Sequence, residues 1–586
     1  MTLDLGFAHL RFEDGTEAGI VDVPGHERFL HNMLAGAAGM ELLLLVIAAN
    51  EGPKPQTLEH LAILEYLGVG HTIVVLTKCD LVDAEELAIA RELAADCTAG
   101  TFAAGAPCIA VSTTTGEGLD ALRAAIAEGL RALPPRAAEA PAYLPIDRVF
   151  ALPGHGTIVT GTLMQGRIAI GDELALVPGG RAVRVRNLHV FGEKRESANG
   201  GTRVALNLPG LETGDTKRGD VIASTQFSQA SSIDVTFRPL PAALGLLKRR
   251  TPVRAYLGSA EILGTLVFEQ VPESPAPVGA TLHLRTPAIV VPGAAFVLRR
   301  VSPKTLLGGG SIGRADAAES AAPEDAPEVA ALLGALRKAG LDGADDAHAG
   351  AAANLRVERA AELLVHLEED GRAMRLRRPA AFIESAVATE CFERAWDRIV
   401  TLERDRPWSA GMTALALSRV LAVPEARLAR VLGAFVEDGR LAYRNGYYAS
   451  PGFVPTLTGS QQEFFDRLFA PDAAAPNAPF SYEAIREALR GVTTPGIFAA
   501  FETLQASGAL VRIEGAVYRA DQIARMRALL EGALRTHKQI TVSAFRELAG
   551  TSRKFAVPLL EWFDANGVTV RSGDVRVLRS KNVVTD

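Results

Sequence analysis

The first 135 residues alternate short apolar runs with helical patterns, and this alternation restricts the fold more than any other feature of the sequence. Four apolar runs have the length of buried strands, and the segments between them place apolar residues at helical spacing. The runs cover residues 18–23, 41–49, 72–76 and 108–112. Strands that alternate with helices build a parallel sheet with helices on both faces. We therefore expect an α/β domain over residues 1–137.

The first of these strands ends in the motif Asp22-Val-Pro-Gly25-His26-Glu27. An aspartate at a strand end can orient the water shell of Mg²⁺, and a glycine lets a backbone N–H approach a γ-phosphate. His26 stands where an attacking water would be positioned. The motif predicts a metal-binding role for Asp22, a nucleotide-binding role for Asp22 and Gly25, and a catalytic role for His26. The alternative is that His26 is a loop residue without a role.

A second motif, Thr77-Lys78-Cys-Asp80, follows the strand at 72–76. An aspartate there can accept hydrogen bonds from guanine N1 and N2, and a lysine stem can lie flat over the base. Ser112-Thr113 follows the last strand and would close over the base through backbone contacts. Each motif is weak alone, but in this order and on these elements they predict guanine-nucleotide binding by Thr77, Lys78, Asp80, Ser112 and Thr113.

A cradle for the phosphates is not found in the sequence. The pattern G-x-x-x-x-G-K-[ST] supplies backbone N–H groups and a lysine to the phosphates, and neither Gly-Lys-Ser nor Gly-Lys-Thr occurs. Such a cradle follows a strand, and a sheet that lacks this strand would also expose an edge. We expect no measurable GTPase activity from the 586-residue chain. Two explanations stay open: Met1 is an internal methionine of a longer protein, or the short protein keeps only RNA or tRNA binding.

Bulk properties exclude several classes of protein. The net charge of −7 means that any nucleic-acid site is a local patch. The four cysteines lack C-x-x-C spacing, which argues against zinc ribbons and disulfide frameworks. No apolar run has the length needed to span a bilayer. We expect a cytoplasmic protein without a membrane partner.

Residues 138–315 show short strands at close spacing with Gly and Pro turns, which is typical of β-barrels. We place one barrel at 138–228 and a second at 229–315. An Ala/Pro/Asp-rich linker follows at 316–328.

Beyond the linker, amphipathic helix pairs end repeatedly in a short β-hairpin, at a period of about 65 residues. This recurrence predicts tandem winged-helix domains, with a generic helical tail as the alternative. We place the four domains at residues 329–395, 396–453, 454–522 and 523–586.

The last of these domains is locally basic. Residues 521–586 contain 11 Lys/Arg and 7 Asp/Glu, a net charge of +4. Arg553 and Lys554 open a helix, where they can meet phosphates beside the helix N–H groups. Because RNA hairpins are read through shape, backbone and a few splayed bases, a basic helix start with a basic hairpin suits RNA. The alternative is a solvated basic face. The predicted RNA-binding residues are Arg553, Lys554, Arg571, Arg576 and Arg579.

Several segments together resemble the SelB family of selenocysteine-specific elongation factors. These segments are Met1-Thr-Leu-Asp-Leu-Gly-Phe7, Val23-Pro-Gly-His-Glu-Arg-Phe-Leu-His-Asn-Met-Leu-Ala-Gly36, Gln56-Thr-x-Glu-His-Leu-Ala-Ile-Leu64, Thr77-Lys-Cys-Asp80, Ile146-Asp-Arg-Val-Phe150, Gly156-Thr-Ile-Val-Thr-Gly-Thr162 and Thr305-Leu-Leu-Gly-Gly-Gly310. The resemblance spans essentially the whole chain, and the winged-helix tail makes it specific. Within this family the fold is a G domain, two barrels and winged helices.

The resemblance implies GTP/GDP and Mg²⁺ as cofactors in the full-length form, with Thr2 as a further metal-binding residue. It also implies selenocysteyl-tRNA, an mRNA hairpin and the ribosome as partners of a monomeric factor. The positions that would surround the aminoacyl group are Phe7, Asp147, Arg148 and Arg203. His155, in a Gly-His-Gly loop, could add a further donor to this pocket.

A selenol is an anion at neutral pH, so Arg148 and Arg203 would attract selenocysteine and hold neutral serine poorly. For Arg203 the alternative is a barrel-surface arginine, and for His155 a loop residue without a role. Two other functions stay open for the chain: a GTPase-deficient RNA- or tRNA-binding protein, and a general carrier of aminoacyl-tRNAs similar to elongation factor Tu.

Overall fold

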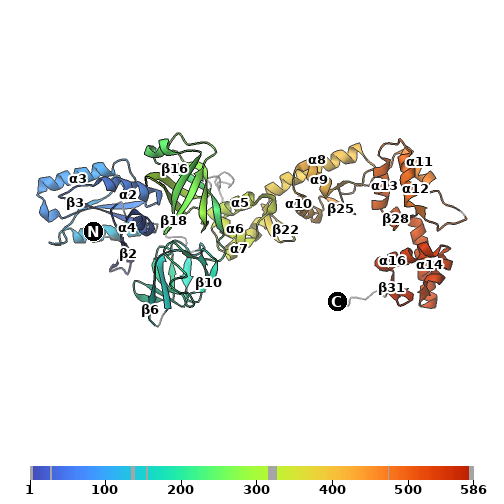
Figure 1. Cartoon of the computed structure of the whole chain (residues 1–586), viewed down its shortest axis with the longest axis horizontal. Helices are drawn as coiled ribbons and strands as arrows, with labels where there is room; N and C mark the ends of the chain where they lie inside the picture. Colours follow the sequence, from blue (N-terminus) through green and yellow to red (C-terminus); the bar gives the residue numbers. More distant parts are fainter. Residues whose placement is uncertain are drawn as a thin grey trace. The chain divides into compact units, whose positions relative to one another are not determined.

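Figure 1 shows the computed structural model, which describes residues 4–26, 29–37, 39–133, 139–153, 156–313, 326–472 and 474–579. The chain forms two compact units. One comprises Met1–Ala339 with Ala344–Ala373, and the other Gly340–Gly343 with Met374–Asp586. The division falls inside the expected segment 329–395, and the domain boundaries stay predictions.

The first unit begins with the expected α/β domain. Three parallel strands, β3 (Leu42–Ala48), β4 (His71–Thr77) and β5 (Cys108–Ala110), lie in the order β3-β4-β5. Alternate side chains of β4 face opposite sides: Val74 packs with helices α2 (Pro55–Tyr66) and α3 (Ala84–Thr98), and Val75 with α4 (Leu119–Ala132). The predicted parallel sheet with helices on both faces is therefore confirmed.

Two further strands, β1 (Gly6–Arg11) and β2 (Glu17–Asp22), form a separate antiparallel pair, and helix α1 (Leu30–Ala37) follows them. Within the part of the chain that the structure describes, β3 pairs only with β4. Val46 of β3 is 62% exposed, which is unusual for a valine in such an apolar strand. The expected open sheet edge is therefore present on β3.

The second domain is an eight-stranded sheet in the order β10-β9-β15-β6-β7-β14-β11-β12, with the pair β13-β8 beside it. Its strands are β6 (Tyr143–Leu152), β7 (Gly156–Thr162), β8 (Arg167–Ala169), β9 (Glu173–Val177), β10 (Arg181–Arg184), β11 (Asn187–Val190), β12 (Glu193–Arg195), β13 (Ser197–Asn199), β14 (Arg203–Asn207) and β15 (Val221–Ala223). Inward residues such as Leu144, Val159 and Leu188 share one core, as in a barrel.

The third domain is a closed six-stranded barrel, β16-β19-β18-β17-β20-β21. Its strands are β16 (Gln229–Pro239), β17 (Arg250–Leu257), β18 (Ala260–Val267), β19 (Val278–Ile289), β20 (Ala295–Arg300) and β21 (Leu306–Ile312). Helix α2 packs closely on this barrel. A Cβ on Gly309 would lie 2.6 Å from the Cβ of Tyr66, so the glycine permits the contact.

Helices α5 (Pro327–Ala339), α6 (Asp346–Ala353) and α7 (Val357–Glu369) complete the first unit. Asn354 exchanges two hydrogen bonds with Gln165, at 2.7 and 3.0 Å. The amide of Gln226 donates to the carbonyl of Leu355 at 2.6 Å. These bonds fix α6 and α7 against the second domain.

The second unit contains most of the pair β22 (Ala373–Leu376) and β23 (Ala381–Glu384), and beyond this pair it repeats one topology three times. Each copy runs helix, strand, helix, helix, hairpin, and its three-stranded sheet places the first strand beside the last. The first copy is α8 (Ser385–Asp405), β24 (Met412–Thr413), α9 (Ala414–Leu421), α10 (Glu425–Glu437), β25 (Ala442–Arg444) and β26 (Tyr447–Ala449). This order is the winged-helix arrangement that the hairpin recurrence predicted.

The next copy is α11 (Gly459–Leu468), β27 (Phe480–Ser481), α12 (Tyr482–Arg490), α13 (Ile497–Ala506), β28 (Leu510–Ile513) and β29 (Ala516–Arg519). The last is α14 (Ala520–His537), β30 (Ile540–Thr541), α15 (Val542–Ala549), α16 (Arg553–Ala565), β31 (Thr569–Ser572) and β32 (Val575–Leu578). Within the described residues, none of the helices combines the length and apolarity needed to cross a membrane.

Candidate functional site

The structure brings the two predicted guanine-reading segments together. Asp80 follows β4 and Ser112 follows β5, and these strands are parallel neighbours. The backbone N–H of Cys79 donates to the carbonyl of Val111 at 3.3 Å, which joins the two loops. Ligands of open α/β sheets bind at the carboxyl ends of strands. Asp80 and Thr113 are exposed there, so both are accessible to a base.

Ser112 shapes its loop from within. It is fully buried, and its hydroxyl accepts hydrogen bonds from the N–H groups of Thr114 and Thr115 at 3.2 and 3.1 Å. Its backbone is committed as well, because its N–H donates to the carbonyl of Glu117 and its carbonyl accepts from the N–H of Gly116, both at 3.0 Å.

Lys78 has a left-handed backbone with a φ of 59°, which turns the chain out of β4. Its ammonium donates to the Glu51 carboxylate at 3.1 Å, and Lys54 lies 3.2 Å from the same carboxylate. The hydrogen bond from Lys78, followed by that from Lys54, lowers the pKa of Glu51. The exposed Glu51 carboxylate therefore pairs with Lys78 beside the predicted guanine-reading loop.

The predicted metal and catalytic residues surround the end of β2. Asp22 closes that strand, while Gly25 and His26 are exposed in the loop behind it. His60 of α2 lies beneath this loop, because a Cβ on Gly25 would be 3.9 Å from its Cε1. Burial lowers the pKa of His60. A single histidine on a helix carries no local sequence pattern, so the sequence did not identify His60 as a candidate site residue.

Thr2 lies outside the described residues. Among the described ones, no group of three His, Cys, Asp or Glu side chains is placed to hold a metal ion. The Mg²⁺ roles of Thr2 and Asp22 therefore stay predictions.

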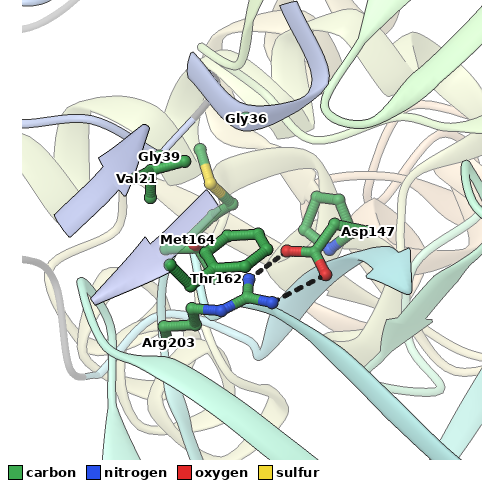
Figure 2. A pocket seen from close by; sticks show the side chains of 9 residues that line it. Val21, Gly36, Gly39, Asp147, Thr162, Met164 and Arg203 are labelled. Atoms are coloured by element: carbon green, nitrogen blue, oxygen red, sulfur yellow. Dashed lines mark hydrogen bonds and ion pairs between the residues drawn. The ribbon is translucent and has the colours of Figure 1, made fainter. Parts of the chain in front are cut away.

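Figure 2 shows a pocket between the α/β domain and the second domain, where the Arg203 guanidinium faces the Asp147 carboxylate. Strands of both domains and the region around α1 supply its lining, which comprises Phe7, Val21, Gly36, Gly39, Pro145, Asp147, Thr162, Met164 and Arg203. A Cβ on Gly39 would be 2.7 Å from the Thr162 Cγ2, so a glycine is needed for the two domains to approach here.

A buried ion pair occupies one wall of this pocket. Asp147 and Arg203 form a two-point contact, in which Nη2 of Arg203 lies 3.0 Å from Oδ1 of Asp147. The hydroxyl of Thr160 donates to Asp147 at 2.7 Å and accepts from Arg203 at 3.1 Å. The side chains of Arg203 and Asp147 are 16% and 8% exposed, so water screens their attraction little.

Phe7 lies beneath both predicted arginines. The Cζ atoms of Arg203 and Arg148 are 3.5 and 4.7 Å from its ring centroid, which is cation–π geometry. Arg148 also donates to the carbonyl of Leu5 at 2.5 Å. The structure therefore brings four of the five predicted pocket residues together. The fifth, His155, lies outside the described residues.

In this conformation the pocket is almost closed, with room for about one water molecule. A side chain larger than water enters only if the residues that line the pocket move apart. This closure was not evident from the sequence.

Sequence reasoning also missed Arg218, in the loop before β15. Its Nη1 lies 3.2 Å from Oδ1 of Asp4 and donates to Oδ1 of Asn32 at 3.0 Å. The pKa of Asp4 is lowered, chiefly by a hydrogen bond from the Leu5 N–H and further by Arg218. Arg218 thus joins the second domain to both segments that flank the predicted nucleotide loop. An arginine in an irregular loop gives no pattern that would reveal this role.

The predicted RNA-binding residues do not all face solvent. Arg553, Lys554, Arg571 and Arg579 are exposed. Arg576 is buried, and its Nε donates to the Asp564 carboxylate of α16 at 2.9 Å. The RNA-binding prediction for Arg576 therefore needs correction. This arginine joins the β31–β32 hairpin to α16, and its guanidinium is not exposed to a ligand at the surface.

Three family models match the chain. Residues 1–132 match the elongation factor Tu GTP binding domain, residues 156–223 match elongation factor Tu domain 2, and residues 532–578 match the elongation factor SelB winged helix.

Whole-length relatives agree with these matches. The chain is 33% identical to a selenocysteine-specific elongation factor of Desulfomicrobium baculatum, covering 99% of this chain and 94% of the relative. It is 29% identical to the protein of the same name from Escherichia coli strain K12, covering 99% and 93%. The crystal structure of a bacterial selenocysteine-specific elongation factor, EF-Sec, is similar in fold, with a TM-score of 0.62, 22% identity and coverage of 99% and 93%.

Proposed function

Because the chain belongs to the family of selenocysteine-specific elongation factors, we propose that it binds selenocysteyl-tRNA and delivers it to the ribosome at recoded UGA codons. The observation that carries this proposal is the pair of guanidiniums, Arg148 and Arg203, stacked on Phe7 beside Asp147. A selenolate that enters this pocket meets a net positive charge at low dielectric. Neutral serine gains little there and leaves the guanidiniums poorly satisfied.

The pocket opens on binding. Because the pocket holds about one water when closed, the selenolate competes with Asp147 for Arg203. Asp147 then acts as a stand-in anion that keeps the arginine oriented while the pocket is empty. The arginine stays paired in both states, and Asp147 keeps the hydrogen bond from the Thr160 hydroxyl when the selenolate binds.

Guanine nucleotide binding uses the loops after β4 and β5, with Asp80 accepting from the base and Lys78 lying over it. Mg²⁺, when bound with the nucleotide, would supply charge neutralisation at the phosphates. Asp22 and Thr2 would hold it, and His26 would orient water at the γ-phosphate. The sequence has no phosphate-cradle motif, so these roles belong to a form of the protein in which the phosphates have ligands.

The last winged helix binds an mRNA hairpin through Arg553, Lys554, Arg571 and Arg579. All four are exposed on the start of α16 or on the following hairpin. The general-carrier alternative lacks support, since these winged helices have no part in it.

The selectivity of the pocket can be tested with one tRNA charged with selenocysteine or with serine. We expect Arg148→Gln to lose at least ten-fold in affinity for selenocysteyl-tRNA and to change seryl-tRNA affinity little. Arg181→Gln is the matched control, because Arg181 belongs to the same domain but pairs with Asp215 at the surface. Equal losses for both aminoacyl groups would contradict the proposed pocket.

A further inference from the structure

Charge alone does not define the side chain that enters the pocket between the α/β domain and the second domain. Arg148 and Arg203 would attract any anion, because a guanidinium binds carboxylates and phosphates through two parallel hydrogen bonds. Aspartate and phosphoserine carry such groups, whereas a selenolate offers a single atom. A pocket that selected by charge alone would hold these larger anions at least as well as selenocysteine, so selection needs a second feature.

The room inside the pocket is that second feature. When closed, the pocket has space for about one water molecule. A selenolate ends in one heavy atom, so it needs the least movement of the walls. A carboxylate carries two oxygens on a carbon, and a phosphate ester is larger still. The freedom of the walls to move therefore decides which anions fit.

The two domains that face each other across the pocket are held at a fixed separation. A Cβ on Gly39 would lie 2.7 Å from Cγ2 of Thr162 and 2.9 Å from its Cβ, so these residues are already in contact. This contact stops the domains from moving closer. Hydrogen bonds between the domains, such as that from Arg218 to Oδ1 of Asn32 at 3.0 Å, oppose their separation. The width of the pocket is therefore fixed in both directions.

Thr162 fills the space beside the charged groups (Figure 2). It is the register partner of Arg203 across β7 and β14, so the two side chains stand next to each other on one face of the sheet. Thr160, two residues earlier on that face, accepts from Arg203 at 3.1 Å and donates to Asp147 at 2.7 Å. Thr160 therefore orients the charges, while Thr162 occupies volume. Because a β-branched side chain is stiff, Thr162 has little freedom to turn aside.

The charged wall is held in place as well. The Cζ of Arg203 lies 3.5 Å from the centroid of the Phe7 ring. Asp147 lies where the register of β6 against β7 shifts, and such a bulge aims a side chain in a new direction. Because Asp147 keeps its hydrogen bond from Thr160 when a ligand binds, it does not vacate a space of carboxylate size. Its charge also repels a second carboxylate.

We propose that the pocket selects by size as well as by charge, with Thr162 as the residue that limits its size. It admits an anionic side chain that ends in one heavy atom, and it excludes carboxylates and phosphate esters. Serine is rejected for lack of charge, whereas aspartate and phosphoserine are rejected for lack of room. This inference rests on the proposed binding of selenocysteyl-tRNA and defines which aminoacyl groups the same site refuses.

The test measures equilibrium affinities of the 586-residue chain for one tRNA charged with selenocysteine, serine, aspartate or phosphoserine. We expect the wild type to bind the selenocysteyl form at least ten-fold more tightly than the aspartyl and phosphoseryl forms. Thr162→Ala removes a methyl and a hydroxyl from the wall, and it should reduce the preference over aspartate three-fold or more. Equal wild-type affinities for the selenocysteyl and aspartyl forms would overturn the proposal.

Two further variants separate lost volume from a lost hydroxyl. Thr162→Val keeps the branched shape of the side chain without its hydroxyl, so it should retain the preference over aspartate that Thr162→Ala loses. Thr213→Ala is the matched control, because Thr213 is exposed in a loop of the same domain. The size filter is wrong if Thr162→Ala leaves the preference unchanged, or if Thr162→Val reduces it as much as Thr162→Ala does.

Small anions test the pocket without tRNA. Bromide is a monatomic anion close in size to a selenolate, and its NMR line broadens when it binds to a protein. Arg148→Gln should remove part of this broadening. Acetate should compete with bromide weakly in the wild type and at least three-fold more strongly in Thr162→Ala. Equal competition by acetate in both proteins would contradict exclusion by size.

The tRNA measurements also separate this inference from the proposed function. A wild type that prefers selenocysteine to serine but binds the aspartyl form equally well would keep selection by charge and reject the size filter. Absence of any preference for selenocysteine over serine would reject both.

Discussion

The buried pair of Asp147 and Arg203 gives the sharpest prediction about the pocket. Removing one partner of a buried ion pair typically costs about 3–5 kcal/mol, because the other charge is left unpaired. Arg203→Met should cost about 3 kcal/mol of stability, at the lower end of this range, because the Thr160 hydroxyl still donates to Asp147. Asp147→Asn should cost about 2 kcal/mol, because the amide oxygen can still accept from Arg203 and Thr160.

The double variant tests whether these costs belong to one interaction. With both charges gone, no buried charge is unpaired. We therefore expect the double variant to lose about 2 kcal/mol of stability, in place of the roughly 5 kcal/mol that additive costs would give. The difference is a coupling of about 3 kcal/mol.

Hydrogen exchange with mass spectrometry suits this multidomain chain, because it reports local opening free energies. Peptides covering β7 and β14 should exchange roughly 100-fold faster in Arg203→Met than in the wild type. The exchange rate of the double variant should lie between those of the wild type and Arg203→Met. Additive costs, or a loss of protection below about three-fold in Arg203→Met, would refute the buried-pair reasoning.

Three further predictions concern other residues. Arg218→Ala should raise exchange in α1 by about ten-fold, because Asn32 and Asp4 lose a shared donor, whereas Arg181→Ala should leave α1 unchanged. Burial holds the folded-state pKa of His60 below the unfolded value of about 6.5, so the unfolded chain takes up the proton first. Stability of the α/β domain should therefore fall as the pH drops below about 6.5, and thermal unfolding of His60→Gln should show a weaker dependence. Arg553→Gln should reduce the slope of log K for RNA against log salt by about 1, whereas Arg576→Gln should leave this slope unchanged and destabilise the last hairpin.

Regular patterns predicted the elements and their order. Parallel strands end at one sheet edge, which is why the positions of Asp80 and Ser112 followed from two apolar runs. The winged helices followed from helix pairs that end in Gly-containing hairpins, such as the one that leads to Tyr447. In both cases short-range sequence determined which residues meet.

Long-range contacts were not predictable in this way. Arg576 looked like a hairpin cation, but its partner Asp564 lies on the preceding helix and draws it inward. Arg218 and Asp4 meet across two domains, 214 residues apart. The near-closure of the pocket depends on how Phe7 packs under two arginines, which no spacing in the sequence encodes.

The central claim is that the pocket selects selenocysteine by its charge. The most direct measurement compares equilibrium affinities of the chain for one tRNA charged with selenocysteine or with serine, at neutral pH and fixed salt. The account predicts at least a ten-fold preference for selenocysteyl-tRNA. Equal affinities would contradict it and favour a carrier that does not distinguish its aminoacyl groups.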